Sequence, residues 1–272
     1  MRILVLGASS FIGRRVKEVL SRNYENVYGT YRTENEIYAR DITMYPYSLG
    51  DSETLKHIFN QTEPDYVISC MRGDFEEQLE MHRLTAEYLA ERAGKLIFLS
   101  TANVFDAAME CEHFENDCLK SKTEYGQFKI KCEMELQSLL GQRAVIIRIP
   151  GVWGRDCPRL VRLIRDIKCG NPVATYKNLF INLTTDVQIA EWILYIIQHG
   201  LDGIFHVGTK DVCEYLSLHR RLIASLHLEE PVFDVTDCGD KREVQAVIPG
   251  RSEIPDSMQT TISEVIQYVT SN

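Results

Sequence analysis

The sequence predicts an α/β fold, with a doubly wound parallel sheet and a smaller, interleaved C-terminal lobe. Strand and helix patterns alternate from the first residues onward, as in a parallel sheet that is covered on both faces. The predicted strands are apolar on both sides, which is typical of buried parallel strands. A glycine-containing turn directly follows the first strand, at the edge of the sheet where such folds bind ligands.

The first half of the chain supplies most of the alternating elements. A strand over 3–6 leads into a helix over 10–21, whose apolar residues repeat at helical spacing. A strand over 27–31 follows, and then a helix over 52–61 with Ser52 as its N-cap. The remaining elements predicted here are a strand within 63–70, a helix over 75–93 and a strand over 95–100.

The second half keeps part of this alternation. A helix over 122–140, a strand over 144–148, a helix over 186–199 and a strand over 204–207 extend the sheet pattern. The segments 151–181 and beyond 208 fit that pattern less well. We therefore expect a first domain over 1–150 and a second lobe over 151–272, with 182–208 returning to the first domain.

Composition and charge exclude several classes of protein. The 272 residues include 30 basic and 39 acidic side chains, so a net charge of −9 argues against nucleic acid or an anionic membrane as partner. No apolar run approaches the ~20 residues of a membrane span, and the apolar N-terminal stretch is too short for a signal peptide. The 8 cysteines are scattered without metal-ligand spacing. These features predict a cytoplasmic protein with reduced thiols and no metal site.

The turn 7–13 is the first chemical signal. Its spacing is Gly-x-x-Ser-x-x-Gly, with Ser10 where a middle glycine is often found. Such a turn lets the backbone approach a diphosphate, which then lies at the N-terminus of the following helix. The predicted dinucleotide contacts in this turn are Gly7, Ser9, Ser10, Phe11, Ile12 and Gly13. The alternative is a turn with a structural role alone.

The end of the second strand bears on the choice of cofactor. It reads Thr30-Tyr31-Arg32, without the carboxylate that usually binds the ribose hydroxyls of NAD. A guanidinium can pair with a 2′-phosphate and stack on adenine. Tyr31 and Arg32 therefore favour NADP over NAD, although Arg32 is also compatible with a solvated loop position.

A tyrosine and a lysine four residues apart give the second signal. Tyr125 and Lys129 lie on one face of a predicted helix, so their side chains can share a pocket. A free tyrosine has a pKa near ~10, and a nearby ammonium favours the phenolate. Thr101 ends an apolar strand, at the edge where the ligands of such sheets bind. Its hydroxyl is placed to bond a reacting carbonyl oxygen beside Tyr125; the alternative is that all three residues are structural.

Together these stretches resemble the extended short-chain dehydrogenase/reductases, and most closely their dTDP-4-dehydrorhamnose reductase-like branch. The matching segments are 7–13, 100–106, 125–129, 148–154 and 203–208, and the resemblance spans about residues 1–230. It implies a Rossmann-type dinucleotide-binding domain over 1–150 and a mainly substrate-binding lobe after it. It also implies that Tyr125 is the general acid, that Lys129 contacts the nicotinamide ribose, and that Thr101 orients the substrate oxygen.

Further site residues follow from the same resemblance. Cys70 and Ser100 join the expected cofactor contacts, and Ala102, Asn103, Trp153 and Arg159 are the expected substrate contacts, although Trp153 is also compatible with a packing role alone. His82 stands where family members often carry asparagine. Ala102 and Asn103 stand where related dehydratases carry an Asp-Glu pair, and the lack of this acid and base disfavours dehydration. Rhamnose-type reductases tend to carry Asp-Tyr at the same place, so the identity of the sugar stays open.

The predicted activity is NAD(P)-dependent reduction of a keto group on a sugar, most simply a nucleoside-diphosphate 4-keto sugar. NADPH is the preferred cofactor, NAD is possible, and a homodimer is compatible with the sequence. Two alternatives stay open: a nucleotide-sugar epimerase with retained NAD, and a non-catalytic NADP-binding regulatory subunit. A basic run, formed by Arg155, Arg159, Arg162, Arg165 and Lys168, suits a diphosphate or a solvated helix face equally. Arg251 is a weaker candidate of the same kind, and His206 is expected to be a satisfied core residue.

Overall fold

The computed structural model describes residues 1–271 and contains two compact units. The first unit comprises 1–100, 127–147 and 189–204, and the second comprises 101–126, 148–188 and the chain from 205 onward. The chain passes between the units several times, so each unit is built from segments distant in sequence. The functional domain boundaries expected from the sequence stay a prediction.

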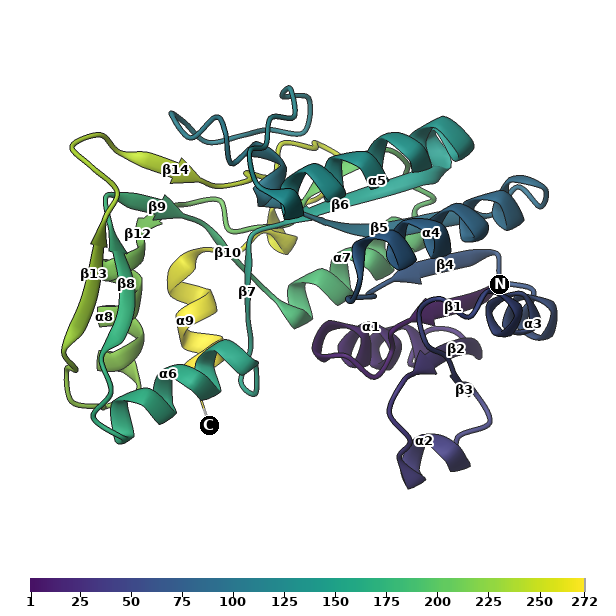
Figure 1. Cartoon of the computed structure of the whole chain (residues 1–272), viewed down its shortest axis with the longest axis horizontal. Coiled ribbons are helices and arrows are strands. Elements are labelled where there is room, and N and C mark those ends of the chain that lie inside the picture. The colour runs from purple at the N-terminus through teal and green to yellow at the C-terminus, as the bar shows by residue number, and fades with distance from the viewer. Residues whose placement is uncertain (272) are drawn as a thin grey trace. The chain divides into compact units, whose positions relative to one another are not determined.

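A seven-stranded parallel sheet is the central feature of the fold (Figure 1). Its order is β11-β6-β5-β4-β1-β2-β3. The bounds are β1 (Arg2–Leu6), β2 (Asn26–Tyr31), β3 (Met44–Pro46), β4 (Tyr66–Ser69), β5 (Lys95–Thr101), β6 (Ala144–Ile149) and β11 (Ile204–His206). Ile3 pairs in parallel with Val27 on one side and with Tyr66 on the other. The strand order therefore reverses at β1, and the predicted doubly wound α/β fold is confirmed.

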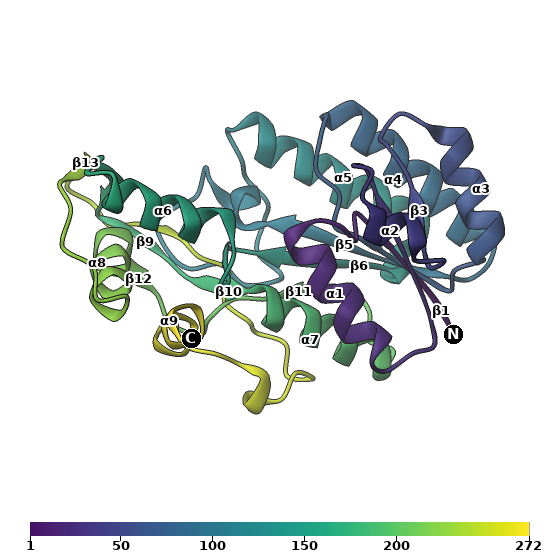
Figure 2. The same cartoon turned by 90° about the horizontal axis from the view of Figure 1, so that it is seen from below.

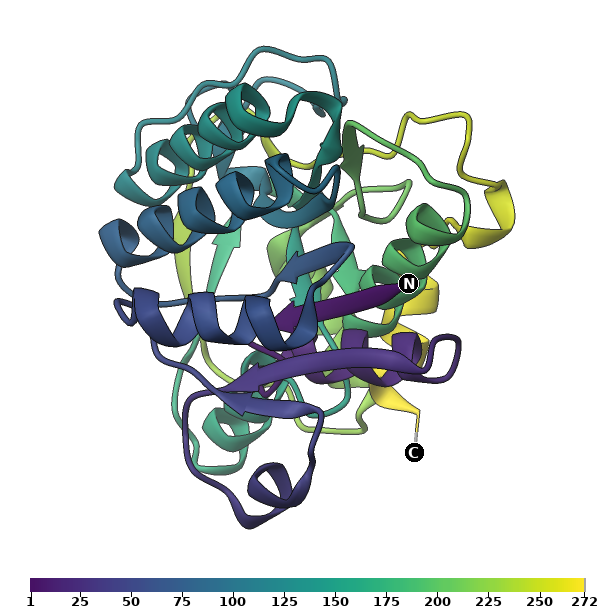
Figure 3. The same cartoon turned by 90° about the vertical axis from the view of Figure 1, so that its right-hand side faces the viewer.

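Helices cover both faces of this sheet in the first unit. The helices α3 (Ser52–Thr62), α4 (Phe75–Ala90) and α5 (Glu124–Leu140) lie on one face, and α1 (Phe11–Ser21) and α7 (Asp186–Gln198) lie on the other (Figure 2). Figure 3 shows the same layers from the side of the first unit. Apolar residues of α3, α4 and α5 pack with those of β1, β4, β5 and β6 in one buried cluster. Burial of these stripes is the main force that holds the helices on the sheet.

The predicted elements agree with the structure within a few residues, with two differences. The N-cap of α3 is Asp51, whose carboxylate accepts from the N–H of Thr54 at 3.0 Å, and Ser52 is instead the first helical residue. The prediction of Ser52 as N-cap was therefore wrong. The short helix α2 (Glu36–Arg40) and the short strand β3 were not predicted. Because α2 buries none of its residues, it leaves no apolar pattern in the sequence.

The second unit contains small sheets and three helices. The strands β7 (Gly151–Trp153) and β10 (Leu183–Thr185) form a parallel pair. A second parallel pair joins β8 (Val173–Lys177) and β13 (Phe233–Asp237). A third sheet has the order β12-β9-β14, formed by Cys213–Glu214, Leu179–Ile181 and Glu243–Gln245. The helices are α6 (Pro158–Lys168), α8 (Tyr215–Ser225) and α9 (Ile262–Thr270). Single turns of 3₁₀ helix are η1 (Ala102–Phe105), η2 (Gly141–Arg143) and η3 (Asp256–Met258).

Two further features of residues 1–271 concern membrane-spanning helices and the state of the cysteines. Within this part of the chain, no helix combines the length and the apolar character that crossing a membrane requires. All 8 cysteines are free thiols.

Candidate active site

The turn after β1 has the shape of a dinucleotide cradle. Gly7 has a φ of +77°, which favours glycine. A Cβ atom on Gly13 would lie 2.1 Å from the carbonyl oxygen of Gly7, so only glycine lets α1 approach the turn this closely. Ser10 caps α1, and its Oγ accepts from the N–H of Gly13 at 3.1 Å. The N-terminus of α1 thus faces a glycine turn, which fits the pyrophosphate of a dinucleotide.

The turn lies where the strand order reverses. A Cβ atom on Gly7 would be 3.0 Å from the carbonyl oxygen of Cys70, so the segments that follow β1 and β4 touch. The N–H of Gly7 donates to Thr30 Oγ1 at 2.8 Å, which ties the turn to the end of β2. In open α/β sheets, ligands bind in the crevice at this reversal. Gly7, Cys70 and the end of β2 are therefore grouped as the sequence predicts for a cofactor site.

The end of β2 carries an aromatic pair and an arginine. Tyr31 is buried and stacks on Tyr38, with ring centroids 5.5 Å apart. Arg32 is exposed, and within residues 1–271 its guanidinium has no hydrogen-bond or ion-pair partner. This charge is therefore available to a ligand. Whether it binds a 2′-phosphate stays a prediction.

Lys129 is a buried cation beside the end of β5. Its side chain is 6% exposed, its Nζ donates to the carbonyl oxygen of Leu99 at 2.9 Å, and it lies 4.4 Å from the centroid of the Phe98 ring. Burial lowers the pKa of Lys129 to about 8, although the neighbouring Cys132 and Glu133 oppose the shift. The ammonium is thus held in a fixed position with little competing solvent.

Two polar pairs surround this lysine in the first unit. Ser100 Oγ donates to the carboxylate of Glu133, and both side chains are buried. His82 Nε2 lies 2.8 Å from Ser69 Oγ, and burial together with the Lys129 charge lowers the pKa of His82 to about 3. The imidazole of His82 is therefore neutral at physiological pH. The Ser100 hydroxyl already has a protein partner, and its predicted contact with the cofactor stays a prediction.

In the second unit, the start of α5 packs on the turn that begins at Thr101. Thr101 Oγ1 accepts from the N–H of Asn103 at 3.2 Å and donates to its Oδ1 at 3.0 Å, which starts the turn η1. A Cβ atom on Gly126 would lie 2.4 Å from the carbonyl oxygen of Asn103. The start of α5 therefore rests directly on η1. Tyr125 precedes Gly126 and is 40% exposed.

Asp106 holds this arrangement in place and was not predicted. Its Oδ1 accepts from Ser121 Oγ at 2.9 Å and from the N–H of Lys122 at 2.7 Å, and its Oδ2 accepts from Thr123 Oγ1. Thr123 Oγ1 in turn accepts from the N–H of Gly126 at 3.2 Å, as an N-cap does. Burial alone would raise the pKa of Asp106, but the hydrogen bonds from Thr123, Lys122 and Ser121 outweigh it and lower the pKa.

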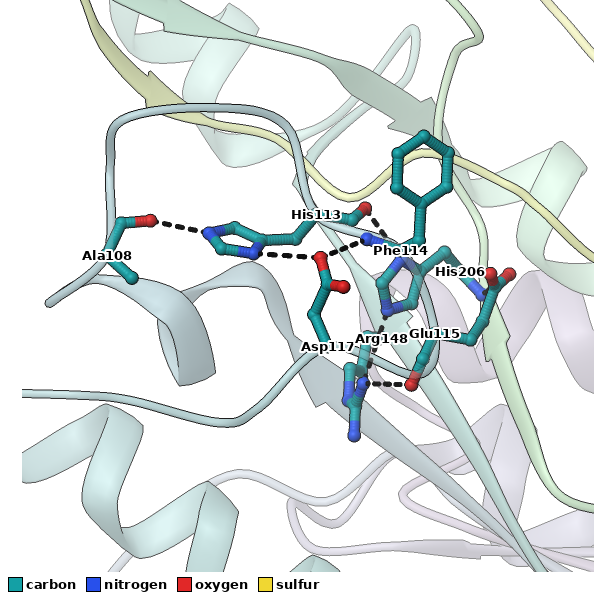
Figure 4. A network of polar contacts seen from close by, with 7 residues as sticks. All are labelled: Ala108, His113, Phe114, Glu115, Asp117, Arg148 and His206. Carbon is teal, nitrogen blue, oxygen red and sulfur yellow. Dashed lines mark hydrogen bonds and ion pairs between the residues drawn. The ribbon is translucent and has the colours of Figure 1, made fainter.

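A second unpredicted feature is a buried polar network of histidines, acids and an arginine (Figure 4). His206 Nδ1 donates to the carbonyl oxygen of His113 at 3.2 Å, and its Nε2 accepts from Arg148 Nη1 at 3.3 Å. Arg148 also donates to the carbonyl oxygen of Glu115 at 3.1 Å, and Glu115 Oε1 accepts from the N–H of His206 at 3.1 Å. Burial and the Arg148 charge lower the pKa of His206 to about 3. His206 is thus a satisfied core residue, as predicted.

The predicted basic run divides into paired and unpaired arginines. Arg162 and Arg165 both pair with Asp166, at 3.4 and 3.3 Å. Arg155 donates to the carbonyl oxygen of Tyr268 at 3.3 Å, and Arg251 pairs with Glu253 at 2.7 Å. Arg159 differs, because its guanidinium lies over the ring of Trp153, 5.5 Å from the centroid. Of the predicted substrate contacts, Trp153 and Ala102 are buried, and Asn103 is half-buried.

Comparison with known proteins agrees with these features. A family model described as the RmlD substrate binding domain matches residues 1–260. A dTDP-4-keto-6-deoxy-D-glucose reductase from Streptomyces niveus is 23% identical over 218 residues, which cover 75% of this chain and 72% of that protein.

Solved structures show the same fold at low sequence identity. A hypothetical dTDP-4-dehydrorhamnose reductase from Sulfolobus tokodaii is 19% identical, with a TM-score of 0.77 over 91% of this chain and 92% of that one. The dTDP-4-dehydrorhamnose reductase of Bacillus anthracis, in complex with NADP, is 14% identical, with a TM-score of 0.79 over 98% and 96% of the two chains. The Bordetella bronchiseptica enzyme WbmH, in complex with NAD+, is 14% identical, with a TM-score of 0.81 over 98% and 96%.

The family model, the reversed strand order and the glycine cradle lead to one assignment. The resemblance that the sequence motifs indicated is confirmed, because the match extends over nearly the whole chain. The chain belongs to the RmlD-like sugar-nucleotide reductase family and is an oxidoreductase of the short-chain dehydrogenase/reductase type.

Proposed function

We propose that the protein uses NADPH to reduce the 4-keto group of a sugar carried on a nucleoside diphosphate. The observation that carries this proposal is the close packing of Gly126 on the Asn103 carbonyl, because it fixes the start of α5, which carries Tyr125, on the turn that begins at Thr101. Lys129 follows one helical turn later, buried and held by Leu99. The similarity to a dTDP-4-keto-6-deoxy-D-glucose reductase supports the class of substrate.

The residues of the chain have distinct parts in this reaction. When bound, NADPH supplies the hydride for the carbonyl carbon. Tyr125 donates the proton to the carbonyl oxygen, and the Thr101 hydroxyl turns from Asn103 to hydrogen-bond that oxygen. The buried Lys129 ammonium holds the cofactor ribose and favours the ionised form of the phenol after proton transfer.

The residues of the first unit fit NADP as the cofactor. The turn 7–13 would hold the pyrophosphate, because its glycines leave room and the N-terminus of α1 attracts negative charge. Arg32 would bind the 2′-phosphate, since its guanidinium has no partner within residues 1–271. Tyr31, stacked on Tyr38, would form part of the adenine surface.

The test is turnover of a dTDP-4-keto-6-deoxy sugar, followed by the loss of NADPH absorbance. We expect Tyr125→Phe to lower kcat by about 10²–10⁴-fold, the usual contribution of a general acid, with NADPH affinity unchanged. Tyr24→Phe is the matched control, because Tyr24 lies in the loop between α1 and β2, in the first unit and outside the turn 7–13. Full activity of Tyr125→Phe would refute the assignment. Sugar interconversion without net NADPH loss would instead indicate an epimerase.

A further inference from the structure

Arg159 is an arginine without an acidic partner in the second unit. Its neighbours on α6, Arg162 and Arg165, both form an ion pair with Asp166. Within the described chain, Arg159 forms no ion pair and no hydrogen bond, and its contact is the face of the Trp153 ring. It lies in the first turn of α6, an 11-residue helix that begins at Pro158. The positive end of the helix dipole and the guanidinium therefore lie close together.

The indole of Trp153 offers a donor at the same place. Trp153 is 1% exposed, and its Nε1 has no hydrogen-bond partner. Buried N–H groups are rarely unpaired in native proteins. A Cβ atom on Gly151 would lie 2.7 Å from Arg159 Nη1 and 3.8 Å from Trp153 Nε1, so both groups converge beside the bare backbone of this glycine.

His219 adds a third unpaired nitrogen. It lies on α8, it is 5% exposed, and its Nδ1 has no hydrogen-bond partner. Burial lowers the pKa of His219 to about 4, and the positive charge of Arg159 adds to this shift. At physiological pH the imidazole is neutral and can present one N–H to a ligand.

We propose that Arg159, Trp153 and His219 form a phosphoryl-binding subsite that holds the diphosphate of the substrate. The planar guanidinium can bind two oxygens of one phosphoryl group, and a tetrahedral group still offers a further oxygen to the indole N–H. A planar carboxylate has no third oxygen to offer. In a chain of net charge −9, an unpaired arginine also gives an anionic substrate a local point of attraction. This inference rests on the proposed function, since it names what the same substrate contacts.

The subsite is tested directly by NMR of the indole N–H groups, since the chain has 2 tryptophans, Trp153 and Trp192. Their two signals are assigned with Trp153→Phe or Trp192→Phe, and either variant is sufficient. Inorganic pyrophosphate is then titrated into the ¹⁵N-labelled protein with saturating NADP+ present, which occupies the cofactor site. Acetate at equal ionic strength is the carboxylate control. We expect a saturable shift of the Trp153 signal with pyrophosphate alone.

Two arginine variants separate specific binding from a general charge effect. Arg159→Gln should weaken the pyrophosphate response at least about tenfold, as expected for loss of a charged hydrogen bond. Arg162→Gln removes the same charge from the same helix, but Arg162 is exposed and already paired, so the affinity should not change. His219→Gln should weaken binding by a smaller factor.

The outcomes separate this inference from the proposed function, because the titration needs no turnover. A Trp153 signal that does not respond, or an equal loss in both arginine variants, would overturn the subsite even if the enzyme reduces keto sugars. Pyrophosphate binding that depends on Arg159, in a protein that reduces no nucleotide-linked keto sugar, would support the subsite and refute the proposed function.

Discussion

Replacing Asp106 should separate the positioning of Tyr125 from the stability of the fold. The Asp106 carboxylate accepts from Ser121, Thr123 and the N–H of Lys122, and Thr123 caps the start of α5. Asp106→Ala leaves the Lys122 N–H without its charged acceptor, whereas the two hydroxyls can turn to water. With about 1.5–3 kcal/mol for a hydrogen bond to a charged group and about 1 kcal/mol for weakening the cap, the loss of stability is about 2–4 kcal/mol.

The catalytic effect should exceed what lost stability explains. Without the Asp106 carboxylate, the first turn of α5 is no longer fixed relative to η1, and an error of about 1 Å in a catalytic group can cost about 10²-fold in rate. We expect kcat of the folded Asp106→Ala protein to fall by roughly that factor. NADPH affinity should stay the same, because the turn 7–13 belongs to the first unit. Asp106→Asn should recover part of the rate, since its amide oxygen can still accept from Lys122.

The assay combines thermal unfolding, calorimetric titration of NADPH and steady-state kinetics well below the unfolding temperature. Asp117→Ala is the matched control, because Asp117 also accepts from a loop N–H, that of Phe114 at 2.9 Å, without contacting the start of α5. It should lower stability and leave kcat nearly unchanged. Equal loss of kcat in the two variants would refute a positioning role for Asp106.

Two further predictions concern charges in the first unit. Burial lowers the pKa of Lys129 from 10.5 to about 8. Above pH 8 the unfolded chain therefore binds more protons than the folded one, and the free energy of unfolding rises with pH. The full rise, reached once Lys129 is deprotonated in both states, is on the order of 3 kcal/mol. Urea unfolding between about pH 8 and pH 10 measures this rise; Lys129→Met should abolish it, and an equal rise in that variant would contradict the assignment. Arg32→Ala should weaken NADPH binding about tenfold or more and leave NADH binding unchanged. In calorimetric titration, Arg40→Ala is the control because Arg40 pairs with Glu36 at 3.3 Å, and equal loss for NADPH and NADH would argue against a 2′-phosphate contact.

The fold was predictable because its signals are local. Strands that are buried on both faces, such as β1 and β4, are continuous apolar runs, and α1 carries its apolar residues at helical spacing. The turn 7–13 was visible for the same reason, since its glycines are neighbours in sequence. By contrast, α2 buries none of its residues, so its composition gave no signal.

The polar networks were not predictable because their partners are far apart in sequence. Asp106 bonds residues 15 to 17 positions later, and His206 bonds Glu115 across 91 positions. An isolated aspartate or histidine carries no mark of such a partner. For Arg159, the informative fact is the lack of a carboxylate partner, which appears only when the neighbours of the side chain are known in space.

The pattern of tyrosine and lysine four residues apart is weak evidence by itself in a chain with 13 tyrosines. The decisive residue is Gly126, between them, because a Cβ atom there would meet both the Asn103 carbonyl oxygen and Ser121 Oγ, at 2.4 and 2.1 Å. Any side chain at this position would push the first turn of α5 away from η1, and the phenol with it. Asp106 bonds Ser121 and Thr123 on the other side of the same contact. The first turn of α5, which carries the proposed proton donor Tyr125, is therefore positioned by a missing side chain and a buried carboxylate, neither of which takes part in the proposed reaction.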